Sequence, residues 1–393
     1  MAKPEIRLKG FEGEWKTTQL DTCVDFLDNM RKPVKEGYRI KGIYPYYGAS
    51  GIVDYIDDYI FDEELILLSE DGANITDRNY PVCFLAAGKY WVNNHAHVLK
   101  AKYGFINSFL CNALERKDYT QYNTGMAMPK LNKEVCKSIP LSIPPAEEQH
   151  AIADYFKSLD SMLQSTTKKI ESLKQMKQAC LVSMFPQAGE TKPRVRFKGF
   201  KGEWEVKKLS SIANRVTRKN THLESTLPLT ISAAEGLIEQ TSFFNNVVAS
   251  SNVSGYYLVK KGEFAYNKSY SNGYPFGAVK RLDRFEKGVL STLYIVFSID
   301  EKVSSDYIVQ FFETSLWHQE VAKRAAEGAR NHGLLNIGAD DFLDINIYLP
   351  NSKDEQQRIA SFFTSLDKQI FLQEQRLEKL KQIKAACLDK MFV

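Results

Sequence analysis

Two long stretches of the chain carry apolar residues at alternating spacings of four and three, the pattern of helices that pack against one another. They cover residues 147–185 and 354–393, and neither contains proline or glycine. The pattern predicts two helices of about 39 residues, each roughly 58 Å long at 1.5 Å per residue. The predicted seam residues are Ile152, Phe156, Leu159, Leu163, Ile170, Leu173, Ile359, Phe363, Leu366, Ile370, Leu377 and Leu380.

The direction of the helix pair follows from two lysines on the seam. Lys177 and Lys384 hold equivalent positions in the two stretches, so a parallel pair in register would place like charges face to face. Antiparallel packing separates them, and we therefore expect an antiparallel coiled coil. The alternative is that each helix is amphipathic independently and covers only its own neighbouring domain.

The stretches before each helix, residues 1–146 and 186–353, read as mixed α/β domains. Both contain short apolar runs, such as 64–68 and 293–297, separated by turn residues, and both end in a short hydrophobic strand before the helix. The expected fold is therefore α+β: two mixed α/β domains joined by two long antiparallel coiled-coil helices.

The chain also repeats itself. Residues 4–15 return as 193–204, and residues 148–160 return as 355–367, with the second likeness continuing to Met184-Phe185 and Met391-Phe392. Between these stretches the two blocks share no comparable likeness, and the second block is longer by about 18 residues. A repeat this long indicates a duplicated domain pair rather than a solenoid, and it predicts a pseudo-two-fold arrangement.

Composition narrows the class of protein. The 393 residues are 44% hydrophobic, and 52 Lys and Arg against 48 Asp and Glu leave a net charge of only +4. We find no run of about 18 apolar residues and no secretory leader, so we expect a cytoplasmic protein without a membrane segment. The six cysteines are scattered without a CxxC pair, which favours free thiols over a zinc site.

Several loops are rich in side chains that can contact DNA. Asn pairs with adenine, Arg and Lys pair with guanine, and Lys, Ser and Tyr can hold phosphates. In the first block the candidates are Tyr46, Tyr47, Ser50, Lys89, Asn93, Asn94, His95 and His97. In the second block they are Lys268, Ser269, Tyr270, Asn272, Tyr274, Arg330, Asn331 and His332. Such polar loops are also common as plain solvated surface.

The sequence offers little that resembles a catalytic site. Gly88-Lys89 is followed by Tyr90 rather than by the hydroxyl residue of a phosphate loop, and His95 and His97 lack a recognisable third metal ligand. Glu115-Arg116-Lys117 resembles only half of a nuclease pattern. We therefore favour a binding role, with no cofactor or metal in this chain. An enzyme with a degenerate site, and a scaffold that binds no DNA, are the alternatives.

The repeated motifs point to one family. Gly10-Phe11-x-Gly13-Glu14-Trp15 and Glu148-Gln149-x-x-Ile152-Ala153, each present twice, resemble specificity subunits of type I restriction-modification enzymes. The resemblance implies that 1–146 and 186–353 are target recognition domains, each reading half of a split site on double-stranded DNA. It implies that helices 147–185 and 354–393 set the spacing of the half-sites and dock two modification subunits.

The same resemblance assigns the chemistry to other chains. It implies that the modification subunits bind S-adenosylmethionine and methylate adenine at N6, and that restriction subunits use ATP and Mg²⁺. This chain would then be a non-catalytic adaptor, and two dissimilar readers would recognise an asymmetric, bipartite sequence. A coiled-coil scaffold, or a solitary DNA-binding protein without such partners, stays open as the other interpretation.

Overall fold

A computed structural model describes residues 3–232, 235–240, 252–269, 273–325 and 335–393. The chain forms two compact units. The first unit joins Met1–Lys168 to Glu374–Val393, and the second is Lys169–Gln373. Each unit therefore consists of one α/β domain and a part of both long helices, a division that differs from the four consecutive segments expected from the sequence.

The two long helices are α5 (Ala146–Ser183) and α10 (Lys353–Met391). Both begin after a proline-containing turn and carry two acidic residues in the first turn, where negative charge favours the helix N-terminus. The helix α5 ends shortly before Pro186. Among the described residues, no helix has the length and apolar character needed to span a membrane.

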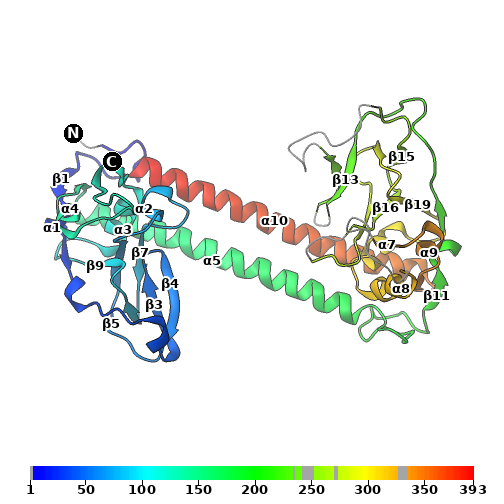
Figure 1. The fold of residues 1–393 in the computed structure, drawn as a ribbon, viewed down its shortest axis with the longest axis horizontal. Helices are drawn as coiled ribbons and strands as arrows, with labels where there is room; N and C mark the ends of the chain where they lie inside the picture. Colours follow the sequence, from blue (N-terminus) through cyan, green and yellow to red (C-terminus); the bar gives the residue numbers. More distant parts are fainter. Residues whose placement is uncertain (1–2, 233–234, 241–251, 270–272, 326–334) are drawn as a thin grey trace. The chain divides into compact units, whose positions relative to one another are not determined.

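The first unit contains two four-stranded sheets and a two-stranded pair (Figure 1). One sheet has the antiparallel order β2-β9-β6-β7, the other has the order β4-β3-β8-β5, and β1 pairs with β10. The strands are β1 (Lys16–Gln19), β2 (Val24–Phe26), β3 (Lys41–Gly48), β4 (Gly51–Ile56), β5 (Phe61–Asp62), β6 (Leu65–Ser69), β7 (Cys83–Ala86), β8 (Lys89–Val92), β9 (Ala96–Ala101) and β10 (Pro140–Ile143). The short helices are α1 (Leu20–Cys23), α2 (Asn74–Asp77), α3 (Asn107–Arg116) and α4 (Lys133–Lys137).

Strand β6 lies at the centre of this unit, and its sequence shows why. All five of its residues are buried, because successive side chains point to opposite faces and both faces are covered. Ile66 and Leu68 belong to the core that includes α3 and the long helices, whereas Leu65 and Leu67 pack with Tyr90 in a second core. A strand covered on both faces reads as a continuous apolar run rather than an alternating one.

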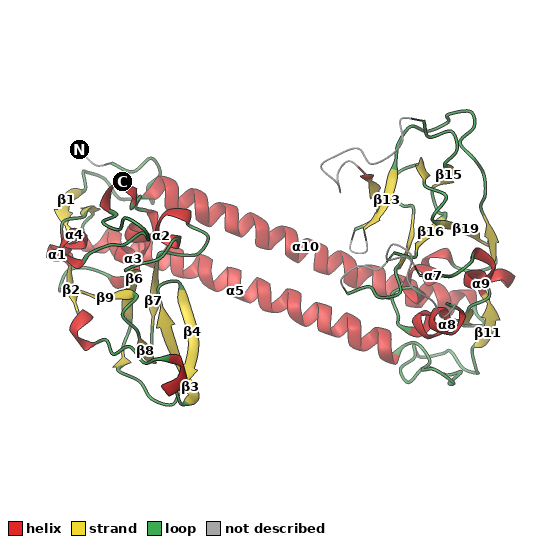
Figure 2. Cartoon of the chain, viewed as in Figure 1, coloured by secondary structure: helices red, strands yellow, loops and turns green. Residues whose placement is uncertain are grey.

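The second unit repeats this frame (Figure 2). Its four-stranded sheet has the order β12-β19-β16-β17, matching β2-β9-β6-β7, and β11 pairs with β20 as β1 pairs with β10. Its other strands form two separate pairs, β13-β14 and β15-β18. The strands are β11 (Glu205–Lys208), β12 (Ala213–Arg215), β13 (Leu229–Ser232), β14 (Gly236–Glu239), β15 (Tyr257–Lys260), β16 (Phe264–Asn267), β17 (Ala278–Arg281), β18 (Lys287–Leu290), β19 (Ile295–Ile299) and β20 (Asn346–Leu349). The helices are α7 (Ser305–Phe311), α8 (Leu316–Arg324) and α9 (Ala339–Leu343).

The ends of the long helices complete the two domain cores. In the first unit the ring of Phe392, just beyond α10, lies 5.8 Å from that of Phe156 in α5 and 6.5 Å from that of Trp15. In the second unit Phe185, just beyond α5, lies 6.1 Å from Phe363 and 6.0 Å from Trp204. In each unit the end of one long helix therefore lies beside the beginning of the other, which confirms the antiparallel prediction.

The predicted seam is buried, but it is not purely a contact between helices. Of its twelve residues, ten are buried and Leu163 and Leu377 are half-buried. Ile152 and Phe156 share their core with residues of α3 and β10, so part of the seam also covers the neighbouring domain. The expectation of a coiled coil and the alternative of a domain-covering helix each describe part of what these helices do.

Candidate nucleic-acid interface

The first unit brings two predicted loops together through a parallel strand pair. Strands β3 and β8 are parallel neighbours, with Tyr46 opposite Trp91 and Tyr47 opposite Val92, so both strands end at the same edge of the sheet. The turn that contains Ser50 follows β3, and the turn 93–95 follows β8. The backbone N–H of Asn93 donates to the carbonyl of Tyr47 over 3.0 Å, which fixes one turn against the other.

Three predicted residues are exposed on these turns: Ser50, Asn94 and His95. The Nδ1 atom of His95 lies 2.8 Å from the carboxylate of Asp71, while half of the side chain is exposed. This contact orients the ring with its other edge toward solvent, where it can accept or donate a hydrogen bond. Amide, hydroxyl and imidazole groups on adjacent turns form a surface suited to contact base edges.

A buried cluster of charged residues packs behind these turns and holds them by hydrogen bonds. Arg31 donates to Glu70 over 2.6 Å and to the backbone carbonyl of Ala96 over 2.7 Å. His97 lies between the Asp28 carboxylate and the carbonyl of Leu131, at 2.8 Å from each. Burial lowers the pKa of His97, but the hydrogen bonding and charge of Asp28 and Cys136 together more than offset this and raise it to about 10. The ring is therefore a protonated structural link at neutral pH.

Three of the residues predicted to contact DNA have side chains that lie inside the domain. His97 is 1% exposed and has the partners just described. Tyr46 is equally buried, and its hydroxyl accepts the N–H of Val34. Asn93 is buried too, and its Oδ1 accepts the N–H of His95. This hydrogen bond holds the shape of the turn.

Of the two remaining predictions in this unit, Tyr47 lies beside the exposed turns and Lys89 lies away from them. Tyr47 is half-buried, with its ring 5.8 Å from Phe84 and 5.6 Å from Tyr90. Lys89 is exposed and its Nζ lies 4.5 Å above the ring of Tyr59, but it begins β8 and so lies at the opposite end of that strand from Asn94. The sequence pattern grouped residues along β8 that the strand separates.

One segment beside these turns was missed from the sequence. Residues 123–130 form a loop. An isolated β-bridge pairs Lys130 of this loop with Asp71, the residue whose carboxylate contacts His95. The N–H of Gly72 donates to the carbonyl of Pro129 over 3.0 Å, which attaches the loop a second time. The Asn, Gly and Pro residues of this segment are turn formers and could have marked it.

The triplet Glu115-Arg116-Lys117, which resembles half of a nuclease pattern, has a structural explanation. The Glu115 carboxylate accepts the backbone N–H groups of Val82 and Cys83 at 2.9 and 2.8 Å. It also pairs with Arg78. These contacts attach α3 to the strand β7 and account for the glutamate without a catalytic role.

In the second unit the described candidates are Lys268, Ser269 and Tyr274. Lys268 donates its Nζ to the carbonyl of Ile337 over 3.3 Å, and its own carbonyl accepts the N–H of Leu335. Ser269 donates its N–H to the Asn267 side chain. Five predicted residues lie outside the described part of the chain: Tyr270, Asn272, Arg330, Asn331 and His332.

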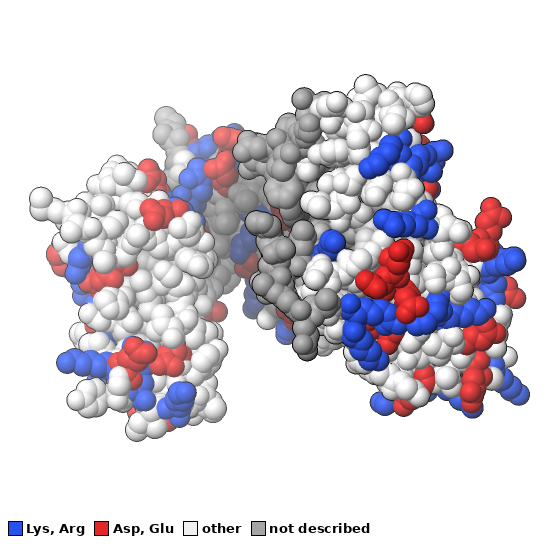
Figure 3. Space-filling view, turned by 45° about the vertical axis from the view of Figure 1, so that its right-hand side comes forward, with Lys and Arg blue, Asp and Glu red and all other residues white. Residues whose placement is uncertain are grey.

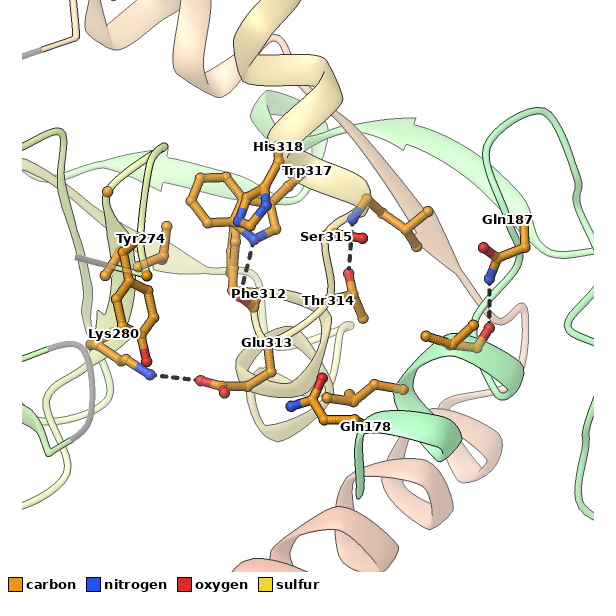
Figure 4. A pocket seen from close by; sticks show the side chains of 17 residues that line it. Gln178, Gln187, Tyr274, Lys280, Phe312, Glu313, Thr314, Ser315, Trp317 and His318 are labelled. Carbon is orange, nitrogen blue, oxygen red and sulfur yellow. Dashed lines mark hydrogen bonds and ion pairs between the residues drawn. The ribbon is translucent and has the colours of Figure 1, made fainter. Parts of the chain in front are cut away.

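Tyr274 lines a cavity of about 440 Å³ in the second unit (Figure 4). In its wall Lys280 and Glu313 form an ion pair with 2.6 Å between Nζ and Oε1. Trp317 and His318 form another part of the lining. The Trp317 indole donates to the carbonyl of Phe312, which fixes that side of the wall. Burial lowers the pKa of His318. Tyr274 therefore lies at the rim of a preformed, partly polar hollow.

Comparison with known proteins identifies the family. Residues 12–175 and 201–382 match the family described as type I restriction modification DNA specificity domain. A putative type I restriction enzyme specificity subunit of Haemophilus influenzae is 37% identical over 158 residues, which are 40% of this chain and 40% of that protein. A type I restriction enzyme specificity subunit of Methanocaldococcus jannaschii is 24% identical over 222 residues, 51% of this chain and 49% of that protein.

A solved structure shares the fold. The S subunit of a type I restriction-modification system from M. genitalium aligns with a TM-score of 0.65 and 15% sequence identity, over 100% of this chain and 99% of that one. The sequence matches span 40 to 49% of the length of the two curated relatives. The family match covers both α/β domains and most of both long helices, so the chain belongs to the family of type I restriction modification DNA specificity domains.

Proposed function

We propose that this chain is the DNA-recognition subunit of a type I restriction-modification complex. The first unit would read one half of an asymmetric, bipartite site on double-stranded DNA, and the second unit would read the other half. The observation that carries the proposal is the repeated frame: the same four-stranded sheet and strand pair occur in both units, whereas the remaining strands are arranged differently. A common frame with two dissimilar reading surfaces is what a split, non-palindromic site requires.

The proposed role is recognition, with the chemistry performed by partners. Modification subunits would bind S-adenosylmethionine and methylate adenine, and restriction subunits would use ATP and Mg²⁺. Two copies of the modification subunit are supported by the repeat, because any docking surface on the shared helices occurs twice. A cavity of about 480 Å³ lies beside Leu388 in the first unit, and the cavity of the second unit lies beside the equivalent Leu181.

The charge distribution supports dependence on these partners for phosphate binding. Net charge is only +4, and Figure 3 shows basic and acidic side chains interspersed on the visible face of the described residues. Because acidic side chains lie among the basic ones, we expect the isolated chain to bind DNA weakly, through phosphate contacts that salt weakens steeply. The complex with modification subunits would bind far more tightly. Tight, salt-insensitive binding by the chain alone would contradict this.

The decisive experiment maps the methylated adenines that the complex produces. The chain is expressed with its modification subunits in a host without adenine methylation, and the genome is sequenced for N6-methyladenine. The expected result is one asymmetric motif of two short parts separated by a spacer of fixed length. Methylation without the chain, a palindromic motif, or no motif would overturn the proposal; a scaffold that binds no DNA predicts the last of these.

A further inference from the structure

The loop 123–130 of the first unit exposes two methionines at its tip. Met126 is fully exposed and Met128 is 60% exposed. Single apolar residues are common on surfaces, but two large ones on one short loop leave an apolar group in water that a partner can cover. Methionine is unbranched and polarisable, which suits contact with an irregular surface.

The base of this loop is held by hydrogen bonds. The side-chain oxygen of Asn123 accepts the backbone N–H groups of both Gly125 and Lys130 at 2.9 Å. The N–H and the hydroxyl of Thr124 donate to the carbonyl of Lys130 over 2.8 and 3.1 Å. A Cβ atom at Gly125 would overlap the carbonyl oxygen of Met128, so the two arms of the loop touch where only glycine fits. The methionines are therefore presented from a fixed position.

That position is next to the polar candidates of the same unit. Asp71 bridges to Lys130 through the backbone, and its carboxylate holds the ring of His95 at 2.8 Å. The N–H of Leu131 donates to the carbonyl of Glu70 over 2.7 Å, and the N–H of Glu70 donates to the carbonyl of His95 over 2.9 Å. The loop and the turn with Asn94 and His95 are thus attached to one short segment.

We propose that Met126 and Met128 contact the bases of the half-site that the first unit reads. The inference rests on the proposed function and adds an apolar contact to the polar ones of Asn94 and His95. Two base groups offer such a contact: the 5-methyl group of thymine in the major groove, and the faces of a base step that is partly unstacked by an inserted side chain. Both are apolar, and either contact would make binding depend on the base or base step at that position.

The test compares variants of the complete modification complex in selections from a library of random duplexes. Met126→Ala with Met128→Ala should relax one or two positions of one half-site and weaken binding about tenfold, with the other half unchanged. Gly125→Ala keeps both methionines but disturbs the loop that presents them, and it should relax the same positions. Tyr103→Ala, which removes a fully exposed hydrophobic side chain just after β9, at the other end of that strand from His95, is the control and should change neither half.

Two further arms separate the kinds of base contact. If a thymine methyl is involved, replacing that thymine by uracil weakens binding of the wild-type complex but not of the double variant. If a side chain is inserted, 2-aminopurine at the affected step brightens with the wild-type complex and not with the double variant. Either result supports the proposal.

Other outcomes would overturn it. A folded double variant that selects an unchanged motif with unchanged affinity excludes the base contact. A folded double variant that no longer assembles with the modification subunits shows that the loop docks protein instead. If the wild-type complex itself selects no bipartite motif, the proposed function fails together with this inference, so the wild-type arm distinguishes the two failures.

Discussion

Lys177 in α5 and Asp367 in α10 form an ion pair with 2.7 Å between Nζ and Oδ1 in the second unit. The equivalent residues of the repeat, Lys384 and Asp160, pair in the first unit at 2.5 Å. The two lysines that would oppose each other in a parallel pair are thus each matched with a carboxylate of the other helix. The helices are antiparallel because their sequences are complementary in that direction, and the complementarity is duplicated with the domains.

Reversing the charge at one position of this pair should weaken the second unit. Asp367→Lys places two ammonium groups together at a site where Lys177 is only 14% exposed, so we expect a loss of about 1–2 kcal/mol in the free energy of unfolding. The double variant Lys177→Asp with Asp367→Lys should recover part of that loss, because Glu313, 3.9 Å from the Lys177 Nζ, would then face a carboxylate. Urea unfolding of the single and double variants measures it, and a double variant no more stable than the single would contradict the ion pair's role.

A buried glutamate at the start of each long helix makes a second repeated contact. Arg7 donates two hydrogen bonds of 2.7 Å to Glu148, which is almost completely buried. Arg196 donates two hydrogen bonds of 2.6 and 2.7 Å to the equally buried Glu355. Arg7→Ala would leave an unpaired buried charge, so we expect a loss of about 3–5 kcal/mol in the first unit. Hydrogen exchange should show lost protection there and not in the second unit.

The matched comparison for this prediction is the exposed Arg194, whose nearest carboxylate is 3.8 Å away. Arg194→Ala should cost less than about 0.5 kcal/mol. Arg7→Lys should recover only part of the loss, because an ammonium group cannot reproduce the paired geometry of a guanidinium. Full recovery by lysine would show that charge alone matters at this site.

The C-terminal end of the chain should stabilise the N-terminal domain. Phe392 packs against Trp15, Phe109 and Phe156, so Phe392→Ala opens a cavity in the first unit and should cost about 3–4 kcal/mol. The effect should appear in the exchange protection of residues 1–168 and in recognition of one half-site only. Removing the half-exposed Val393 is the control, and Phe185→Ala should act in the same way on the second unit.

These contacts show which parts of the fold were predictable. The repeated motifs and the heptad spacing predicted both long helices, because seam residues such as Phe156 and Phe363 recur with regular periodicity. Their antiparallel direction was predicted from the like charges of Lys177 and Lys384. The division into units was not predictable from the pattern. It depends on Phe392 and Phe185, which pack into cores formed by residues far from them in the sequence. Such long-range contacts leave no pattern in the neighbouring sequence.

The candidate site was only partly predictable for a related reason. His95 and His97 are two residues apart, so they look equivalent in a polar run, yet one faces solvent and the other faces Asp28 inside the domain. His95 lies in the turn before β9 and His97 lies within that buried strand, and the sequence alone does not mark where the turn ends and the buried strand begins. The loop with Met126 carried no polar cluster and was therefore overlooked.

The buried histidine should make the first unit sensitive to alkaline pH. The pKa of His97 is raised to about 10 in the fold, so the stabilising charge is fully present below about pH 6.5 and is lost as the pH rises through 10. The free energy of unfolding should fall by up to about 5 kcal/mol across that range. Urea unfolding from pH 6.5 to 10 measures the fall.

Two variants isolate the cause of that pH dependence. His97→Gln removes the titrating group, and Asp28→Asn removes the carboxylate that holds the proton. Both should be less stable than the wild type at pH 6.5 and should show a much flatter dependence above it. A His97→Gln protein that keeps the wild-type slope would place the alkaline sensitivity elsewhere.

Adjacent asparagines on the turn after β8 should have opposite phenotypes. Asn94 is exposed, so Asn94→Ala should leave the unfolding free energy within about 0.5 kcal/mol of the wild type. If it contacts a base edge, the variant should lose about 1–3 kcal/mol of discrimination at one position of one half-site. Asn93 is buried and its Oδ1 holds the N–H of His95, so Asn93→Ala should instead cost about 1–2 kcal/mol of stability.

Measuring the stability and the selected DNA motif of both variants distinguishes a residue that contacts a base from one that holds the shape of the turn. Asn93→Ala disturbs the turn, so its motif should weaken at several positions of the same half, whereas Asn94→Ala should relax one position sharply. The other half-site should be unchanged in both, because the second unit has its own core and, in the proposed function, reads the other half. If either variant altered both halves of the motif equally, the two units would not be independent readers, and the repeated frame would need another explanation.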